Sequence, residues 1–171
     1  MAGAWSAVTS AATPLAPSDR PDVSVVVPTR QGADRLEGLW AAVRPVVGRW
    51  DGAVEVIFVD DGSTDATWAC IDALAVDPRV RGVRLARQVG QAGALCAGFS
   101  VARDEVVVSM DDDLEIAPEG IGLLADAIRA GAGFASGRRT TRGGPPVRRF
   151  ASQLYNARLR LAGFPLHDAG C

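Results

Sequence analysis

Four neighbouring carboxylates are the residues of this chain best suited to chemistry. Asp111, Asp112 and Asp113 are consecutive, Glu115 follows two positions later, and the apolar residues 106–110 before them predict a buried strand. Side chains alternate on extended backbone, so Asp111, Asp113 and Glu115 are expected to share one side. Carboxylate oxygens suit Mg²⁺ or Mn²⁺, ions that usually hold substrate phosphates as well. The stretch predicts a metal–phosphate site, with a solvated acidic turn before the next helix as the alternative interpretation.

Two other predicted strands also end in polar residues. Residues 22–28 lead into Thr29 and Arg30, and residues 54–59 lead into the segment Asp60-Asp61-Gly62-Ser63. In a parallel sheet the carboxyl ends of the strands lie at one edge, where ligands bind. We therefore expect the three polar strand ends to form one site.

Strands and helices alternate along the chain. Strands are expected at 22–28, 54–59, 80–85, 106–110 and 134–136, and helices at 33–47, 64–75, 91–102, 118–129 and 148–161. This alternation predicts an α/β fold in which helices flank a mainly parallel, doubly wound sheet. The length of 171 residues favours one domain, 22–171, after a disordered N-terminal tail, 1–21, that is rich in Ala, Ser, Thr and Pro.

The charged residues exclude several functions and favour an anionic partner. All 18 basic residues are arginine, which excludes phosphate loops and Schiff-base sites that need a lysine. The net charge of −2 gives no general attraction to nucleic acid. Residues 127–167 nevertheless contain eight arginines and no acid, which indicates an anion partner near that part of the chain. No apolar run approaches the ~18–20 residues of a membrane span, so we expect a cytoplasmic protein with at most peripheral membrane contact.

Several motifs together resemble those of glycosyltransferase family two, whose members are nucleotide-sugar enzymes of the GT-A fold. The motifs lie at residues 25–29, 59–65 and 110–115. Residues 87–98, 137–152 and 168–171 further resemble the dolichyl-phosphate mannosyltransferase and polyprenyl-phosphate glycosyltransferase branch. The resemblance implies a Rossmann-like GT-A domain whose usual C-terminal part is missing after Cys171.

The resemblance also implies roles for individual residues. The nucleotide sugar would be bound by Pro28, Asp60, Asp61, Asp111 and Asp112. Mg²⁺ or Mn²⁺ would be held against the donor diphosphate by Asp111, Asp113 and Glu115. The acceptor phosphate would be bound by Arg139, Arg148, Arg149 and Ser152, with Asp113 and Arg139 as the catalytic residues. One departure from the family pattern is Gly32, where the family usually has a glutamate that would contact the nucleoside.

The implied function is an inverting, metal-dependent transfer of a hexose from a GDP-mannose or UDP-glucose type donor. The acceptor would be a polyprenyl or dolichyl phosphate at the inner face of the cell membrane. A phosphate is already anionic and needs positioning more than a general base, and arginine binds it bidentately. The alternatives are an inactive nucleotide-sugar-binding remnant of such an enzyme and, less favoured by residues 29–32, a nucleotidyltransferase.

Overall fold

The computed structural model describes residues 7–11, 22–50, 52–115 and 117–137. The predicted acceptor-phosphate residues Arg139, Arg148, Arg149 and Ser152 and the predicted helix 148–161 lie outside this range. The predicted nucleotide-sugar-binding residues Pro28, Asp60, Asp61, Asp111 and Asp112 lie within it.

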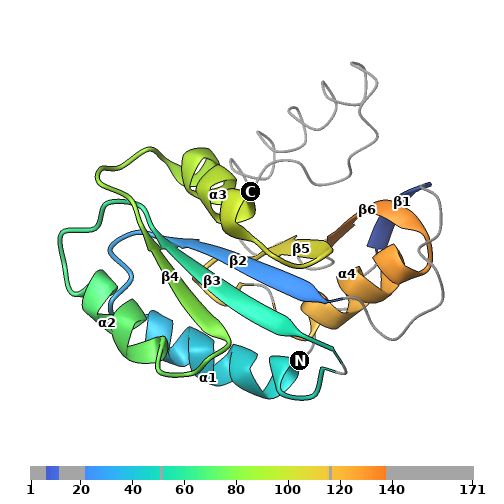
Figure 1. The fold of residues 1–171 in the computed structure, drawn as a ribbon, viewed down its shortest axis with the longest axis horizontal. Helices are drawn as coiled ribbons and strands as arrows, with labels where there is room; N and C mark the ends of the chain where they lie inside the picture. The colour runs from blue at the N-terminus through green and yellow to red at the C-terminus, as the bar shows by residue number, and fades with distance from the viewer. Residues whose placement is uncertain (1–6, 12–21, 51, 116, 138–171) are drawn as a thin grey trace, which may run out of the picture.

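A four-stranded parallel sheet forms the centre of the described fold (Figure 1). Its strands are β2 (Val23–Thr29), β3 (Val54–Asp60), β4 (Val80–Arg84) and β5 (Val106–Ser109), in the spatial order β4-β3-β2-β5. Val25 lies opposite Val56 of β3 and Val108 of β5. The predicted parallel sheet is therefore confirmed, and β2 lies at its centre, where the direction of strand succession reverses.

Helices cover both faces of this sheet (Figure 1). They are α1 (Leu36–Val47), α2 (Thr67–Leu74), α3 (Gln91–Val101) and α4 (Gly120–Arg129). Alternate side chains of β2 enter two separate cores: Val25 packs in the core that contains α1, α2 and α4 residues, and Val26 packs in the core beneath α3. Burial on both faces explains why the strands are nearly continuous apolar runs.

A separate two-stranded ribbon was not expected from the sequence. Strand β1 (Ala7–Ala11) pairs antiparallel with β6 (Ala132–Gly137), so that Val8 lies opposite Ser136. Part of the expected N-terminal tail thus forms a strand, and the predicted strand 134–136 lies in this ribbon, outside the parallel sheet. Pairing at a strand edge uses backbone groups, so the side-chain pattern of the two segments does not predict it.

The close approach of α3 to the sheet gives a prediction about stability. A Cβ atom at Gly98 would lie 2.3 Å from Cγ1 of Val26 and 3.1 Å from Cγ2 of Val59, and both valines are fully buried. We expect Gly98→Ala to lower the free energy of unfolding by about 1–2 kcal/mol, because overpacking outweighs the gain in helix propensity. Urea denaturation measures this change.

A matched control lies in α1. Gly38 has nothing within 4 Å of its added Cβ atom, so Gly38→Ala should stabilise the protein by about 0.5–1 kcal/mol. Equal effects of the two substitutions would contradict the packing described for α3.

At the amino end of the sheet lies a polar cluster whose charge depends on pH. The Ser24 hydroxyl lies 2.8 Å from Glu55 Oε1 and 3.1 Å from Asp104 Oδ2, and Arg81 Nη1 donates to Glu55 Oε2 at 2.6 Å. Burial and the nearby Glu55 raise the pKa of Asp104. Burial opposes ionisation of Glu55 as well, but hydrogen bonds from Arg81 and Ser24 outweigh it and lower the pKa of Glu55.

The raised pKa of Asp104 predicts a stabilising substitution. The folded state binds the Asp104 proton more tightly than the unfolded state, so stability is lost as the pH rises from the ordinary value of 3.8 through the folded pKa. Asp104→Asn should therefore raise the melting temperature at neutral pH and have little effect below pH 3.8. Thermal unfolding at both pH values checks this, and a lower melting temperature at neutral pH would contradict it.

Candidate functional site

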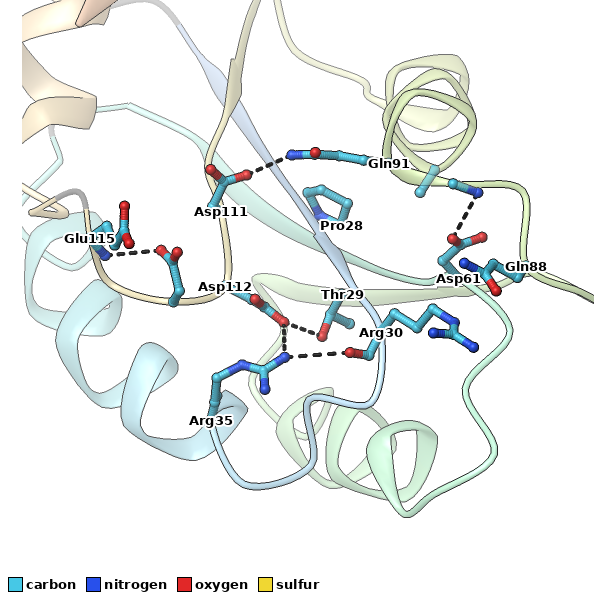
Figure 2. Close-up of a pocket in the computed structure, with 13 residues that line it drawn as sticks. Pro28, Thr29, Arg30, Arg35, Asp61, Gln88, Gln91, Asp111, Asp112 and Glu115 are labelled. Carbon is cyan, nitrogen blue, oxygen red and sulfur yellow. Dashed lines mark hydrogen bonds and ion pairs between the residues drawn. The ribbon is translucent and has the colours of Figure 1, made fainter. Parts of the chain in front are cut away.

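A cavity of about 420 Å³ lies at the carboxyl end of the parallel sheet, where β2, β3 and β5 end (Figure 2). The residues that line it are Pro28, Thr29, Arg30, Arg35, Asp61, Gln88, Gly90, Gln91, Ala94, Asp111, Asp112, Asp113 and Glu115. The three polar strand ends thus meet in one place, as the sequence predicted. The cavity lies beside β2, where β3 and β5 diverge, which is the usual ligand position in such sheets.

Asp61 fixes the wall of the cavity that leads into α3. Its carboxylate accepts hydrogen bonds from the backbone N–H groups of Val89, at 2.7 Å, and Gly90, at 2.9 Å. Gly62 follows with a φ of 65°, a left-handed conformation that glycine adopts without strain. Asp61 therefore ties the loop after β4 to the end of β3, and it presents its carboxylate at the cavity.

Asp60 takes a different position from its neighbour. Its side chain is fully buried, and Oδ1 accepts a hydrogen bond from the Ser63 backbone N–H at 2.9 Å. Oδ2 lies 3.7 Å from Nε of Arg84. Asp60 is not among the residues that line the cavity, and its hydrogen bond to Ser63 shapes the turn after β3.

The acidic segment after β5 turns and does not continue as extended backbone. Leu114 has a φ of 56°, and the Glu115 backbone N–H donates to Oδ1 of Asp113 at 2.9 Å. The extended-strand argument for a shared side is therefore wrong for these residues. The turn nevertheless brings Asp111, Asp113 and Glu115 to the same cavity, and Gln91 Nε2 donates to Asp111 Oδ1 at 2.9 Å (Figure 2).

Asp112 is held by residues from two other segments. Its Oδ2 atom accepts hydrogen bonds from the Thr29 hydroxyl at 2.6 Å and from Nη2 of Arg35 at 2.9 Å (Figure 2). The hydrogen bond to Asp112 is the main cause of a raised pKa of Arg35, which keeps this guanidinium charged. Asp112 is thus held by partners from the end of β2 and the residue that precedes α1.

Several residues that line the cavity were not predicted as site residues from the sequence. Arg35 lies on the wall after β2, and Gln88 and Gln91 lie on the wall that begins α3. The position of Gln91 directly after Gly90, at the start of a helix and near a polar rim, is a signal that the sequence contains. Arg35 carries no such signal, because it looks like an ordinary charged residue at the start of an amphipathic helix.

The side chains at the cavity suit a hard cation that shares its ligands with a phosphate. Within the described part of the chain, no three His, Cys, Asp or Glu residues are grouped so that they could hold a metal ion by themselves. Mg²⁺ is commonly held by one or two carboxylates together with substrate phosphates. The carboxylates of Asp111 and Asp113 fit that arrangement, so metal binding should depend on a phosphate ligand.

The described helices are all too short or too polar to cross a membrane.

A parallel sheet with helices on both faces and a ligand-sized cavity at its carboxyl edge defines a Rossmann-like α/β fold. The chain belongs to glycosyl transferase family 2, because the model of that family matches residues 24–168. The family and the GT-A fold that the motifs predicted are therefore confirmed.

Curated relatives and a solved structure agree with this assignment. The undecaprenyl-phosphate 4-deoxy-4-formamido-L-arabinose transferase of Aeromonas hydrophila is 36% identical over 87% of this chain and 47% of its own length. The dolichol-phosphate mannosyltransferase of Pyrococcus furiosus is 34% identical over 71% of this chain and 34% of its own. The chain therefore spans about half, or less, of the length of these relatives.

The solved structure is glucosyl-3-phosphoglycerate synthase from Mycobacterium tuberculosis, in complex with Mn²⁺, uridine diphosphate and glucosyl-3-phosphoglycerate. It superposes with a TM-score of 0.63 and 25% identity, over 86% of this chain and 53% of its own. The similarity covers most of this chain and about half of that enzyme.

Proposed function

We propose that this chain acts as an inverting, metal-dependent glycosyltransferase. The donor is a nucleotide sugar of the GDP-mannose or UDP-glucose type, and the acceptor is a polyprenyl or dolichyl phosphate. The observation that carries the proposal is that Asp61 and the acidic segment 111–115 line one cavity in a family 2 chain. Relatives named for transfer to undecaprenyl phosphate and dolichol phosphate support the choice of acceptor.

The cavity residues have separate tasks in this reaction. Asp61 is held by two backbone N–H groups and offers its carboxylate at the end of the cavity next to Pro28, where it can accept a hydrogen bond from the nucleoside. Asp111 and Asp113 would hold a divalent cation, Mg²⁺ or Mn²⁺, against the donor diphosphate. When bound, such an ion would supply positive charge to stabilise the leaving diphosphate.

The acceptor phosphate acts as the nucleophile. It is already anionic, so the reaction requires no general base. Its attack on the face of the sugar opposite the diphosphate inverts the anomeric centre in a single displacement. Arg139, Arg148, Arg149 and Ser152 are proposed to bind this phosphate, with Arg139 closest to the reaction. Because the proposed acceptor is a lipid, the reaction would take place at a membrane, and we propose the inner face of the cell membrane. A cytoplasmic protein would reach this face through peripheral contact.

The test separates donor binding from transfer. Calorimetric titration of the 171-residue chain with UDP, GDP, ADP and CDP, with and without Mn²⁺, should show metal-dependent binding of UDP or GDP. Incubation with the labelled nucleotide sugar and a short polyprenyl phosphate should then give a glycosyl phosphate of inverted configuration. Absence of metal-dependent binding to any of the four nucleotides would overturn the proposal.

The second candidate function is nucleotide-sugar binding without transfer. The observation that favours it is the cavity itself, because Asp61, Asp111 and Asp113 in its lining are assigned to donor and metal binding and not to the acceptor phosphate. Both candidates predict metal-dependent nucleotide binding. Only the transferase predicts the labelled lipid product, so binding without any product would favour the non-catalytic function.

A further inference from the structure

Asp112, the middle residue of the acidic triplet, is bound by residues that come from the other side of the cavity. Thr29 is the last residue of β2, Arg35 directly precedes α1, and Asp112 follows β5. Both hydrogen bonds converge on a single oxygen, Oδ2 of Asp112, at 2.6 Å from Thr29 Oγ1 and 2.9 Å from Arg35 Nη2 (Figure 2). We call these three residues the Asp112 clamp.

The clamp leaves no room for a side chain at position 32. A Cβ atom on Gly32 would lie 2.3 Å from Thr29 Oγ1, 3.0 Å from Asp112 Oδ2 and 3.2 Å from Arg35 Nη2. The glycine also has its backbone N–H bonded to the Thr67 hydroxyl at 2.8 Å, so it cannot easily move away. Gly32 is therefore a requirement of the clamp, because a larger residue there would displace the Thr29 hydroxyl.

The clamp also separates the charge of Asp112 from the charges of Asp111 and Asp113. Three adjacent carboxylates would carry three negative charges, one more than a divalent cation neutralises. Arg35 pairs with Asp112 and neutralises its charge, which leaves the charges of Asp111 and Asp113 for the cation. The Asp112 side chain is only 16% exposed, so this pair is stronger than an ion pair on the surface. Asp111 and Asp113 each have a partner outside the clamp, since Gln91 Nε2 donates to Asp111 and the Glu115 backbone N–H donates to Asp113.

We propose that Arg35, together with Thr29, is a positioning residue of the donor site. It holds Asp112 against the end of β2, so that Asp111 and Asp113, the residues on either side, are the ones presented to the cation and the diphosphate. The proposal rests on the proposed function, because it needs a metal–diphosphate ligand in the cavity. It adds a residue from the α1 side of the fold to a site otherwise built from the segments after β3 and β5.

Arg35→Met removes the guanidinium and keeps most of the apolar stem. The carboxylate of Asp112 then has no cation beside it, and it can compete with its neighbours for the metal. We expect the affinity for UDP or GDP in the presence of Mn²⁺ to fall about 10- to 100-fold, as for other losses of a partner that orients a metal ligand. The affinity measured without metal should not change.

A second substitution should reverse the effect if the clamp acts through Asp112. In the double variant Arg35→Met with Asp112→Asn, the uncompensated charge is gone, and the asparagine oxygen can still accept the Thr29 hydroxyl. Most of the lost metal-dependent affinity should return, a non-additivity that two independent sites would not show. Gly32→Ala perturbs the same atoms without changing any charge, and it should reproduce the loss caused by Arg35→Met.

The matched control is Arg129→Met in α4. Arg129 Nη2 lies 3.8 Å from Asp126 Oδ1 in an exposed pair, and neither residue lines the cavity. This variant should bind nucleotide and Mn²⁺ as the unaltered chain does.

The measurements are calorimetric titrations of each variant with UDP and GDP, with and without Mn²⁺, and thermal unfolding. Unchanged metal dependence in Arg35→Met, or a double variant as weak as the single one, would overturn the positioning role. A lower melting temperature with intact metal dependence would do the same, because it would show a purely structural contact. If the unaltered chain itself fails to bind UDP and GDP with Mn²⁺, the proposed function fails first, and the clamp proposal fails with it.

Discussion

Asp113→Ala will remove the metal dependence of nucleotide binding. Asp113 lines the cavity and lies in the turn where its Oδ1 accepts the Glu115 backbone N–H at 2.9 Å, which fixes the direction of the carboxylate. In the proposed function, two carboxylates and the diphosphate supply the ligands, which agrees with the lack of a described group of three acids or histidines that could hold the ion alone. Loss of one of the two carboxylates should lower the Mn²⁺-dependent affinity by about 100-fold or more, beyond the effect of an outer-shell change.

The measurement is calorimetric titration with UDP and GDP at fixed Mn²⁺, repeated without metal. Asp72→Ala is the control, because Asp72 is an exposed residue of α2 that does not line the cavity. The residual affinity of Asp113→Ala should equal that of the unaltered chain without metal. If Mn²⁺ strengthens binding to Asp113→Ala as much as to the unaltered chain, the assignment of Asp113 as a metal ligand is wrong.

The parts of this fold that repeat a simple pattern could be predicted from the sequence. Strands β2 and β3 are nearly continuous apolar runs because both faces of the sheet are buried, and that pattern identifies them. The convergence of the three polar strand ends followed from the parallel topology alone. The structure bears out that convergence for Asp61 and for residues 111–113.

Adjacent residues at a strand end could not be distinguished in the same way. Asp60 and Asp61 both follow an apolar run, and both were expected to contact the nucleotide. Asp60 is fully buried and bonded to Ser63, whereas Asp61 lines the cavity. Which of two neighbouring carboxylates faces a cavity depends on the exact residue at which the strand turns, and composition does not fix that residue.

Contacts between distant segments were also beyond the sequence pattern. The contact of Arg35 with Asp112 joins residues 77 positions apart, and nothing local to Arg35 marks it. Gly32 was interpreted as the loss of a carboxylate, but the structure gives it a steric reason, since the clamp occupies the space of its Cβ atom. The pairing of β1 with β6 belongs to the same class, because it depends on backbone groups and not on a side-chain period.

Gly62→Ala should damage both the fold and the cavity. Gly62 has a φ of 65°, and an added Cβ atom would lie 2.5 Å from the carbonyl carbon of Arg87 and 2.5 Å from the backbone nitrogen of Gln88. A left-handed conformation costs a non-glycine residue about 1–2 kcal/mol, and overpacking adds about 1–3 kcal/mol. Because backbone atoms cannot rotate away as a side chain can, we expect a total loss of about 2–5 kcal/mol in the free energy of unfolding.

The same clash should move the loop that Asp61 holds. Residues 87–90 donate the N–H groups of Val89 and Gly90 to Asp61, so a shift of this loop breaks the wall of the cavity between β3 and α3. Nucleotide affinity should therefore fall together with stability in Gly62→Ala. Asp61→Asn should weaken nucleotide binding as well, because one of its two acceptor oxygens becomes a donor, but it introduces no steric clash.

Urea denaturation and calorimetry on the same protein samples check both parts of this prediction, with Gly38→Ala as the control for a glycine substitution in open space. Gly38→Ala should keep full nucleotide affinity and gain slightly in stability. A Gly62→Ala protein as stable as the unaltered chain would mean that residues 87–90 do not pack against Gly62. The role given to Asp61 depends on that packing, because the two N–H groups that orient its carboxylate come from this loop.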